Sequence, residues 1–182
     1  MYKKPVKNTC QNALFLDRDG VINYDFGYVH SKKNFDFIPG IFKLVSTAQD
    51  RGYKVIIVTN QSGIGRGYYS DDDFWKLMNW VKDVFKQNKG HIDDIYYCPD
   101  KPSKNQNTIS FRKPNPGMIL KAAIDHDLCL KKCLLVGDNL SDIEAGKSAG
   151  VGHNILFQPK GLVDVDQNHS CVNNLLQIIN YI

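Results

Sequence analysis

Two aspartates with the spacing Asp-x-Asp, Asp17 and Asp19, follow a short apolar run and are followed at once by a glycine. The run from Ala13 to Leu16 predicts a buried strand, and open α/β sheets bind ligands at the carboxyl ends of such strands. Two carboxylates at this position indicate Mg²⁺ chemistry, with one acid as nucleophile and the other as general acid and base. Taken alone, the motif has an alternative interpretation, in which the strand simply ends in an ordinary loop and the two aspartates have no chemical role.

Three later segments supply complementary groups at the ends of further predicted strands. Thr59 begins a glycine-containing turn, whose hydroxyl and backbone N–H groups suit a phosphate. Arg112 and Lys113 stand just before a predicted helix, and Asp138 follows another apolar run. An acid pair, a hydroxyl, a lysine and a third acid are what Mg²⁺-dependent phosphoryl transfer through an aspartyl-phosphate requires.

The elements that would position these residues alternate between strands and helices. Strands are predicted at 13–16, 53–58, 95–98, 133–136 and 153–157, with a short strand near Cys171 and a closing helix. Helices are predicted after Gly40, from Ser70 to about Lys89, from Asn115–Pro116 to about His126, and from about Ser141 to Ala149. This order predicts an α/β fold, a three-layer Rossmann-like parallel sheet with helices on both faces and no large cap domain. We expect one domain over residues 1–182, with its core at about 12–158.

Composition limits the class of protein. The chain has 182 residues, 42% hydrophobic and 23% charged, which is typical of a soluble globular domain. Its net charge of +4 favours small anionic substrates and permits a nucleic-acid partner without requiring one. We find neither a signal peptide nor a membrane-spanning run, so we expect a cytoplasmic protein. Five cysteines without a Cys-x-x-Cys pair predict no disulfide framework, and we expect Cys129 and Cys133 to be buried apolar residues.

In order and in spacing, these segments resemble the haloacid dehalogenase superfamily of phosphohydrolases over roughly residues 13–157. The resemblance implies that Asp17 is the nucleophile. It implies that Asp19 protonates the leaving oxygen and then activates water. Thr59 and Lys113 would hold the phosphoryl oxygens and offset the developing charge.

The same resemblance implies a Mg²⁺ site formed by the carboxylates of Asp17 and Asp138 and the backbone carbonyl of Asp19. Oxygen ligands of this kind are those that Mg²⁺ prefers. Asp142 has two interpretations. It orients Lys113 or a metal-bound water, or it is an acid in the first turn of a helix.

Within the superfamily, the chain resembles the subfamily of bacterial D-glycero-D-manno-heptose 1,7-bisphosphate phosphatases, which are related to histidinol phosphatases. The likeness is carried by segments 25–30, 59–67, 96–99 and 112–118. It implies removal of the 7-phosphate from a small phosphorylated sugar, with Arg112 recognising the second phosphate or the sugar hydroxyls. The residues implied to bind the substrate are Asp25, Phe26, Gly27, Tyr28, Asn60, Gln61, Ser62, Arg112 and Asn139.

The chain departs from that subfamily at two places. Many members hold a structural zinc through Cys-x-His and Cys-x-Cys, whereas this chain has Cys98-Pro99-Asp100 and then Ile109-Ser110-Phe111. One thiolate cannot complete a tetrahedral site, so we expect Mg²⁺ and no structural zinc. Members often have a lysine where this chain has Asn139, which brings no charge to the substrate.

Three other functions stay open at this point. A histidinol phosphatase would use the same chemistry. A nucleic-acid 3′-phosphatase shares the Thr-Asn-Gln and Arg-Lys-Pro segments, but its basic groove with stacking aromatics is supported here only by Tyr68 and Tyr69. A non-catalytic binding module could keep the same fold. We expect a monomer without a membrane or nucleic-acid partner, because a site covered only by loops favours a compact chain.

Overall fold

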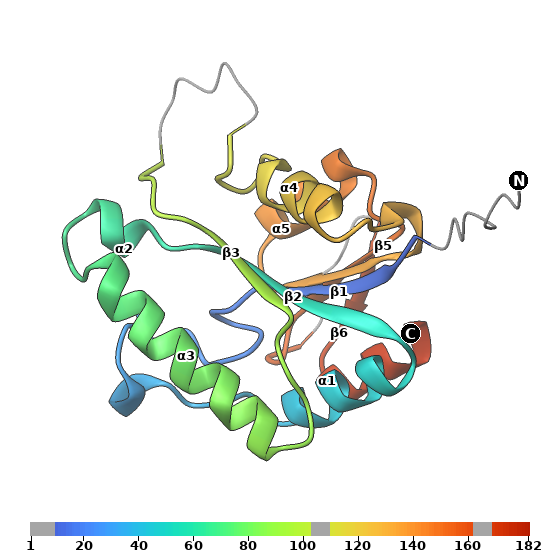
Figure 1. Cartoon of the computed structure of the whole chain (residues 1–182), viewed down its shortest axis with the longest axis horizontal. Coiled ribbons are helices and arrows are strands. Elements are labelled where there is room, and N and C mark those ends of the chain that lie inside the picture. The colour runs from blue at the N-terminus through green and yellow to red at the C-terminus, as the bar shows by residue number, and fades with distance from the viewer. Residues whose placement is uncertain (1–9, 103–109, 162–168) are drawn as a thin grey trace, which may run out of the picture.

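The computed structural model describes residues 10–102, 110–161 and 169–182. Within them, six strands form one parallel sheet in the order β3-β2-β1-β4-β5-β6 (Figure 1). The strands are β1 (Asn12–Leu16), β2 (Tyr53–Asn60), β3 (Asp94–Cys98), β4 (Leu134–Gly137), β5 (His153–Phe157) and β6 (Ser170–Val172). Each predicted strand is present, and the predicted α/β fold class is confirmed.

Helices cover both faces of the sheet. Figure 1 shows α1 (Ile41–Asp50) and α3 (Asp71–Gln87) on one face, and α4 (Gly117–Asp125) and α5 (Leu140–Ala149) on the other. The closing segment is a 3-10 helix, η3 (Leu175–Tyr181), which packs on the α1 side. No cap domain is formed by the part of the chain that the structure describes, and none of its helices has the length and apolar character needed to cross a membrane.

Burial on both faces explains why the strands are continuous apolar runs. In β1, Leu14 and Leu16 pack into the core beneath α1 and α3, whereas Ala13 and Phe15 pack against α4 and α5. Neighbouring side chains of a strand point to opposite faces, so a strand covered twice must be apolar at every position. The same pattern holds along β2 and β4.

The strand order determines where the site lies. β1 pairs with β2 on one side and with β4 on the other, so the order reverses between β1 and β4. Ligands of such sheets bind outside the carboxyl ends of the strands at this reversal. The Asp17 N–H donates to the Val136 carbonyl at 2.9 Å, which brings the loops after β1 and β4 together.

Most helix boundaries follow the sequence, with small differences. Asn139 and Asp142 form a capping box at the start of α5, and Gly150 ends that helix at φ +85°. α4 begins one residue later than predicted, with Pro116 rather than Asn115 as its N-cap, because the Asn115 N–H donates to the Arg112 carbonyl in a preceding turn. The short helices α2 (Ser62–Gly65), η1 (Lys32–Asn34) and η2 (Leu130–Lys132) were not predicted, since three or four residues show no helical period.

One prediction about the cysteines is wrong. Cys10 and Cys129 form a disulfide across a sequence separation of 119 residues, so Cys129 is not simply a buried apolar side chain. The Gln11 N–H donates to the Asp127 carbonyl at 2.9 Å, and this contact brings the start of β1 to the turn before η2. A pairing over such a distance leaves no local signal in the sequence. Cys133 is buried, as predicted.

The capping box of α3 gives a prediction about stability. The Ser70 hydroxyl accepts from the Asp73 N–H at 3.1 Å, and the Asp73 carboxylate accepts from the Ser70 N–H at 3.0 Å. Ser70→Ala should lower the free energy of unfolding by about 1 kcal/mol, because the first turn loses an acceptor. Urea denaturation measures this change. Ser148→Ala, at an exposed position inside α5, is the control and should leave stability equal or slightly higher. An equal loss of unfolding free energy in both variants would contradict the role of Ser70 as the N-cap of α3.

Candidate active site

A cavity of about 360 Å³ lies at the carboxyl edge of the sheet. Every site residue predicted from the sequence lines it, with the exception of Phe26. The Phe26 side chain is 62% exposed and lines a neighbouring cavity together with Lys160. The cavity wall also contains Tyr69, Ser141 and Asp142. Of these, the sequence indicated Asp142 as a candidate for the site and Tyr69 only as a stacking aromatic for nucleic acid.

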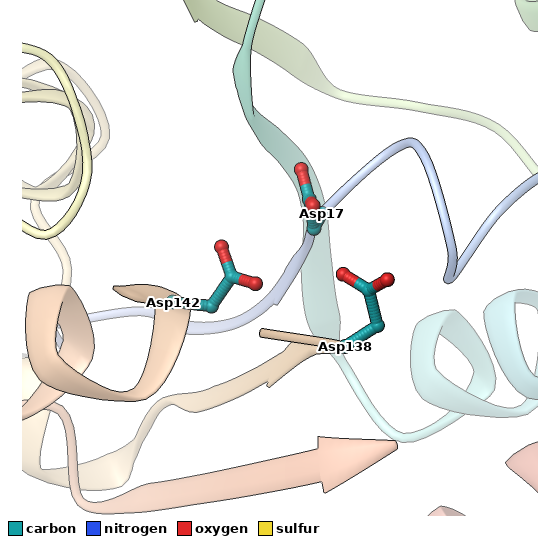
Figure 2. A group of neighbouring side chains, drawn as sticks. All are labelled: Asp17, Asp138 and Asp142. Carbon is teal, nitrogen blue, oxygen red and sulfur yellow. The ribbon is translucent and has the colours of Figure 1, made fainter. Parts of the chain in front are cut away.

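Three acids converge in this cavity. Figure 2 shows Asp17 after β1, Asp138 after β4, and Asp142 in the first turn of α5, with their carboxylates facing a common space. One oxygen from each lies within 4.8 Å of the others. Gly20 leaves room for this arrangement, because a Cβ at that position would lie 2.0 Å from the Asp138 Oδ2.

The Lys113 ammonium is buried among these acids. Its Nζ donates to the Val58 carbonyl at 2.8 Å and forms ion pairs with the Asp17 Oδ1, also at 2.8 Å, and with the Asp142 Oδ1. The Asn60 amide holds the Lys113 backbone, because it donates to the Lys113 carbonyl at 3.1 Å and accepts from the Lys113 N–H at 3.0 Å. Asn60, predicted to bind substrate, therefore lines the cavity but uses both ends of its amide to position Lys113.

Burial and charge act against each other in this cluster. Burial raises the pKa of Asp17 to about 7, although the charge of Lys113 opposes the shift. Burial, with the charge of Asp142, raises the pKa of Asp138 to about 6. Burial alone would lower the pKa of Lys113, but the charges of Asp142 and Asp17 outweigh it, so its pKa lies above the usual value. Because three acidic side chains face a single ammonium, a bound cation would improve the charge balance of the cluster.

Both interpretations of Asp142 apply. Its Oδ1 contacts Lys113, and its Oδ2 accepts from the Asn139 N–H at 3.1 Å as part of the capping box of α5. The Asn139 Oδ1 accepts from the Ser141 N–H at 3.0 Å, which places Asn139 at the helix start on the cavity rim. Because both Asp142 oxygens are engaged, the carboxylates of Asp17 and Asp138 are the better candidates for a cation. An all-oxygen donor set of this kind fits Mg²⁺.

The Asp19 carboxylate is held by several donors. The Nη2 of Arg18 donates to its Oδ1 and Oδ2 at 2.8 and 2.6 Å, the Asn23 amide donates to Oδ1 at 3.0 Å, and the Gln61 amide donates to Oδ2 at 3.1 Å. Arg18 is fully buried and also donates to the Val29 carbonyl at 2.7 Å. Sequence reasoning missed Arg18 and Asn23. An arginine between two acids, directly after a buried strand, was the available signal for Arg18.

The outer wall of the cavity comes from two loops. Arg112 donates from its Nη1 to the Asp100 carbonyl at 2.9 Å, which ties its guanidinium to the segment after β3. In the loop after β1, the Asp25 carboxylate accepts from the Gly27 N–H at 2.8 Å, and the Tyr28 ring meets Tyr68 edge-on at 4.8 Å. Between β3 and Arg112, residues 103–109 lie outside the described residues.

The close approach of Gly20 to Asp138 gives a prediction about metal binding. Gly20→Ala should raise the Kd for Mg²⁺ by at least about tenfold, because the new Cβ would displace the Asp138 carboxylate. Titration calorimetry of the metal-free protein measures this Kd.

Gly52→Ala is the matched control. Gly52 has φ +82° against +85° for Gly20, but a Cβ there meets no atom within 4 Å. It should carry the same backbone strain and leave the Kd unchanged. A Kd that is unaltered in Gly20→Ala would contradict the metal site.

Known proteins match this chain over most of its length. A model of the haloacid dehalogenase-like hydrolase family matches residues 10–150. A curated relative from Burkholderia mallei, D-glycero-alpha-D-manno-heptose-1,7-bisphosphate 7-phosphatase, is 55% identical over 149 residues, or 80% of this chain and 79% of the relative. A second curated relative, D-glycero-beta-D-manno-heptose-1,7-bisphosphate 7-phosphatase from Helicobacter pylori strain J99, is 41% identical over 175 residues. That match covers 96% of this chain and 98% of the relative.

A solved structure supports the same assignment. D,D-heptose 1,7-bisphosphate phosphatase from B. bronchiseptica, crystallised in complex with magnesium and phosphate, matches with a TM-score of 0.82 at 27% identity. The match covers 93% of this chain and 97% of that one. By the extent of these matches, and with an Asp17–Lys113–Asp138 cluster at the expected sheet edge, this chain belongs to the haloacid dehalogenase-like hydrolases.

Proposed function

We propose that the cavity is the active site of a Mg²⁺-dependent phosphomonoesterase in which Asp17 is the nucleophile. The observation that carries the proposal is the contact of Asp17 with the buried Lys113, within 4.8 Å of Asp138. Asp17 and Asp138, with the backbone carbonyl of Asp19, would hold the cation. When bound there, Mg²⁺ supplies positive charge that attracts the phosphate and stabilises the transferring phosphoryl group.

The residues divide the reaction into two steps. In the first, the Asp17 carboxylate attacks phosphorus, the bond to the leaving oxygen breaks, and Asp19 gives that oxygen a proton. In the second, Asp19 takes a proton from a water that attacks phosphorus, and the bond to Asp17 breaks to release phosphate. Lys113 and the Thr59 hydroxyl stabilise the phosphoryl oxygens in both steps.

We propose that the substrate is D-glycero-D-manno-heptose 1,7-bisphosphate and that its 7-phosphate is removed. The curated relatives carry names for both anomers of this sugar. A cavity of about 360 Å³ with mainly polar walls suits a small phosphorylated sugar. Arg112, on the outer wall, would bind the second phosphate, and remote anchoring of that kind helps to position the reacting end.

Other wall residues would border the sugar. Asp25, Gly27 and Tyr28 form one side of the cavity, while Ser62 and Asn139 stand at the starts of α2 and α5. We assign Phe26 no contact with the reacting end, since it lines the neighbouring cavity. Asn60 and Gln61 would act through the residues that they hold rather than on the sugar.

The proposed function predicts the behaviour of Asp17→Asn. This variant should fold normally and lose at least about a thousandfold in kcat, because an amide cannot act as the nucleophile. Phosphate release with Mg²⁺ should be measured for both heptose 1,7-bisphosphate anomers, histidinol phosphate and a 3′-phosphorylated oligonucleotide.

Asp50→Asn, an exposed position at the end of α1, is the matched control and should keep wild-type activity. Preference for a heptose anomer supports the proposed substrate. Preference for histidinol phosphate or the oligonucleotide would overturn the substrate but keep the mechanism. Near-wild-type turnover by Asp17→Asn would overturn the mechanism itself.

We further propose that the loop after β3 is held without zinc. The Cys98 thiol is buried and donates to the Asp100 carboxylate at 3.5 Å. The Gly65 N–H donates to the Pro99 carbonyl at 3.1 Å, and Arg112 is bonded to Asp100. These contacts fix the described ends of the loop to the walls of the cavity.

Metal analysis of purified, untagged protein should therefore find well below one zinc per chain. Treatment with a zinc chelator should leave the melting temperature unchanged once Mg²⁺ is restored, because the contacts of the described loop ends use no metal. One zinc per chain, or a melting temperature that falls on chelation and recovers with zinc, would contradict this proposal.

The remaining proposals concern the cellular setting. We propose that the protein works as a monomer in the cytoplasm, where a charged sugar bisphosphate is retained, and that it binds neither membranes nor nucleic acid. Reduction of the Cys10–Cys129 disulfide, which is expected in that compartment, should not alter the cavity. The pair lies before β1 and β4, at the amino ends of the strands, on the opposite edge of the sheet from Asp17.

A further inference from the structure

We propose that Tyr69 is a positioning residue for the reaction and acts through the amide of Gln61. That amide holds both the acid–base carboxylate of Asp19 and the hydroxyl of Thr59. The inference rests on the proposed function, since it concerns the efficiency of proton transfer to the leaving oxygen. Tyr69 itself was not among the residues predicted from the sequence.

The Gln61 side chain has a single satisfied orientation. It is 2% exposed, and its Nε2 donates to the Asp19 Oδ2 at 3.1 Å and to the Thr59 Oγ1 at 2.9 Å. The Tyr69 hydroxyl donates to the Gln61 Oε1 at 2.6 Å. Both N–H groups and the carbonyl oxygen of the amide are therefore in use. A flipped amide would place its oxygen against the Asp19 carboxylate.

This orientation has a consequence for Thr59. Thr59 is 1% exposed, and its hydroxyl oxygen accepts from Gln61, so the hydroxyl hydrogen is directed elsewhere. Because Thr59 lines the cavity, that hydrogen is available to a phosphoryl oxygen. Gln61 thereby makes Thr59 a donor toward the substrate.

The same amide completes the support of Asp19. Arg18 contacts both carboxylate oxygens and Asn23 contacts Oδ1, while Gln61 bonds Oδ2 from the side of Thr59. A general acid must present its proton along the leaving oxygen, so the plane of the carboxyl group matters. Loss of the Gln61 contact would free one side of that group.

The Tyr69 ring is confined to one place. It is 7% exposed and stacks on the His30 ring, with centroids 5.1 Å apart and an interplanar angle of 8°. Gly63 permits this position, since a Cβ there would lie 2.2 Å from the Tyr69 Cε1. Ser70, the next residue, is the N-cap of α3. The hydroxyl is therefore held at a fixed point relative to Gln61.

Tyr69→Phe tests the proposal through its dependence on the leaving group. The nitrophenolate of p-nitrophenyl phosphate leaves without a proton, whereas an alkoxide requires one from Asp19. The alkyl phosphate for this comparison is whichever substrate the wild-type protein hydrolyses fastest among the heptose bisphosphates, histidinol phosphate and the oligonucleotide. The ratio of its kcat/KM to that of p-nitrophenyl phosphate should fall by at least about tenfold in Tyr69→Phe. A wild-type ratio, with or without an equal loss on both substrates, would overturn the proposal.

A double-mutant cycle tests whether Tyr69 acts through Gln61. Gln61→Met removes the amide at similar size and should lower the same ratio at least as far. Adding Tyr69→Phe to Gln61→Met should then cause no further loss, whereas additive losses would overturn the proposal. If Tyr69→Phe fails to fold, Gln61→Met alone carries the test, and an unchanged ratio in that variant would be contradictory.

Tyr97→Phe is the matched control. Its hydroxyl donates to the Asp71 carboxylate at 2.6 Å, at the start of α3 and outside the wall of the cavity. It loses a comparable hydrogen bond and should keep the wild-type ratio; a fall like that of Tyr69→Phe would overturn the proposal. A wild-type protein that hydrolyses neither substrate would refute the proposed function itself, which separates that failure from a failure of the present inference.

Discussion

The buried ion pairs of Lys113 are the interaction on which the rest of the site depends. The carboxylates of Asp17, Asp138 and Asp142 each place one oxygen within 4.8 Å of the others. Carboxylates this close repel one another, and burial strengthens the repulsion. Lys113 offsets it by contacting Asp17 and Asp142, and Asn60 fixes the Lys113 backbone. Removing one partner of such a buried pair typically costs about 3–5 kcal/mol. One ammonium therefore fixes the relative positions of four segments: the loop before α4, the end of β2, the end of β1 and the start of α5.

Two glycines are as important to the geometry as the charged groups. Gly20 admits the Asp138 carboxylate, and Gly63 admits the Tyr69 ring, each at a distance that any Cβ would prevent. The first approach brings a second acid to Asp17, and the second brings a hydroxyl to Gln61. The two sides of the cavity are thus assembled by the same means, a close approach to a backbone position that has no side chain.

Much of this arrangement could be predicted because parallel strands deliver their carboxyl ends to one edge. Continuous apolar runs indicate the strands, so Asp17, Thr59 and Asp138 can be grouped at one sheet edge from the sequence alone. The partners of those residues could not be predicted. The contacts of Gln61 with Asp19 and Tyr69 join different loops, and the Cys10–Cys129 pair joins distant segments, so neither leaves a local pattern. The outward position of Phe26 depends on a loop turn that composition does not specify.

The central claim is that phosphate passes through a covalent bond to Asp17. It is tested most directly by mixing the protein with substrate and Mg²⁺, quenching in acid within milliseconds, and measuring the mass of each peptide. The account predicts one added phosphoryl group on the peptide that contains Asp17, localised to that residue and absent from Asp17→Asn. Phosphate release with no phosphorylated peptide at any quench time, or a phosphoryl group on Asp19 instead, would contradict it.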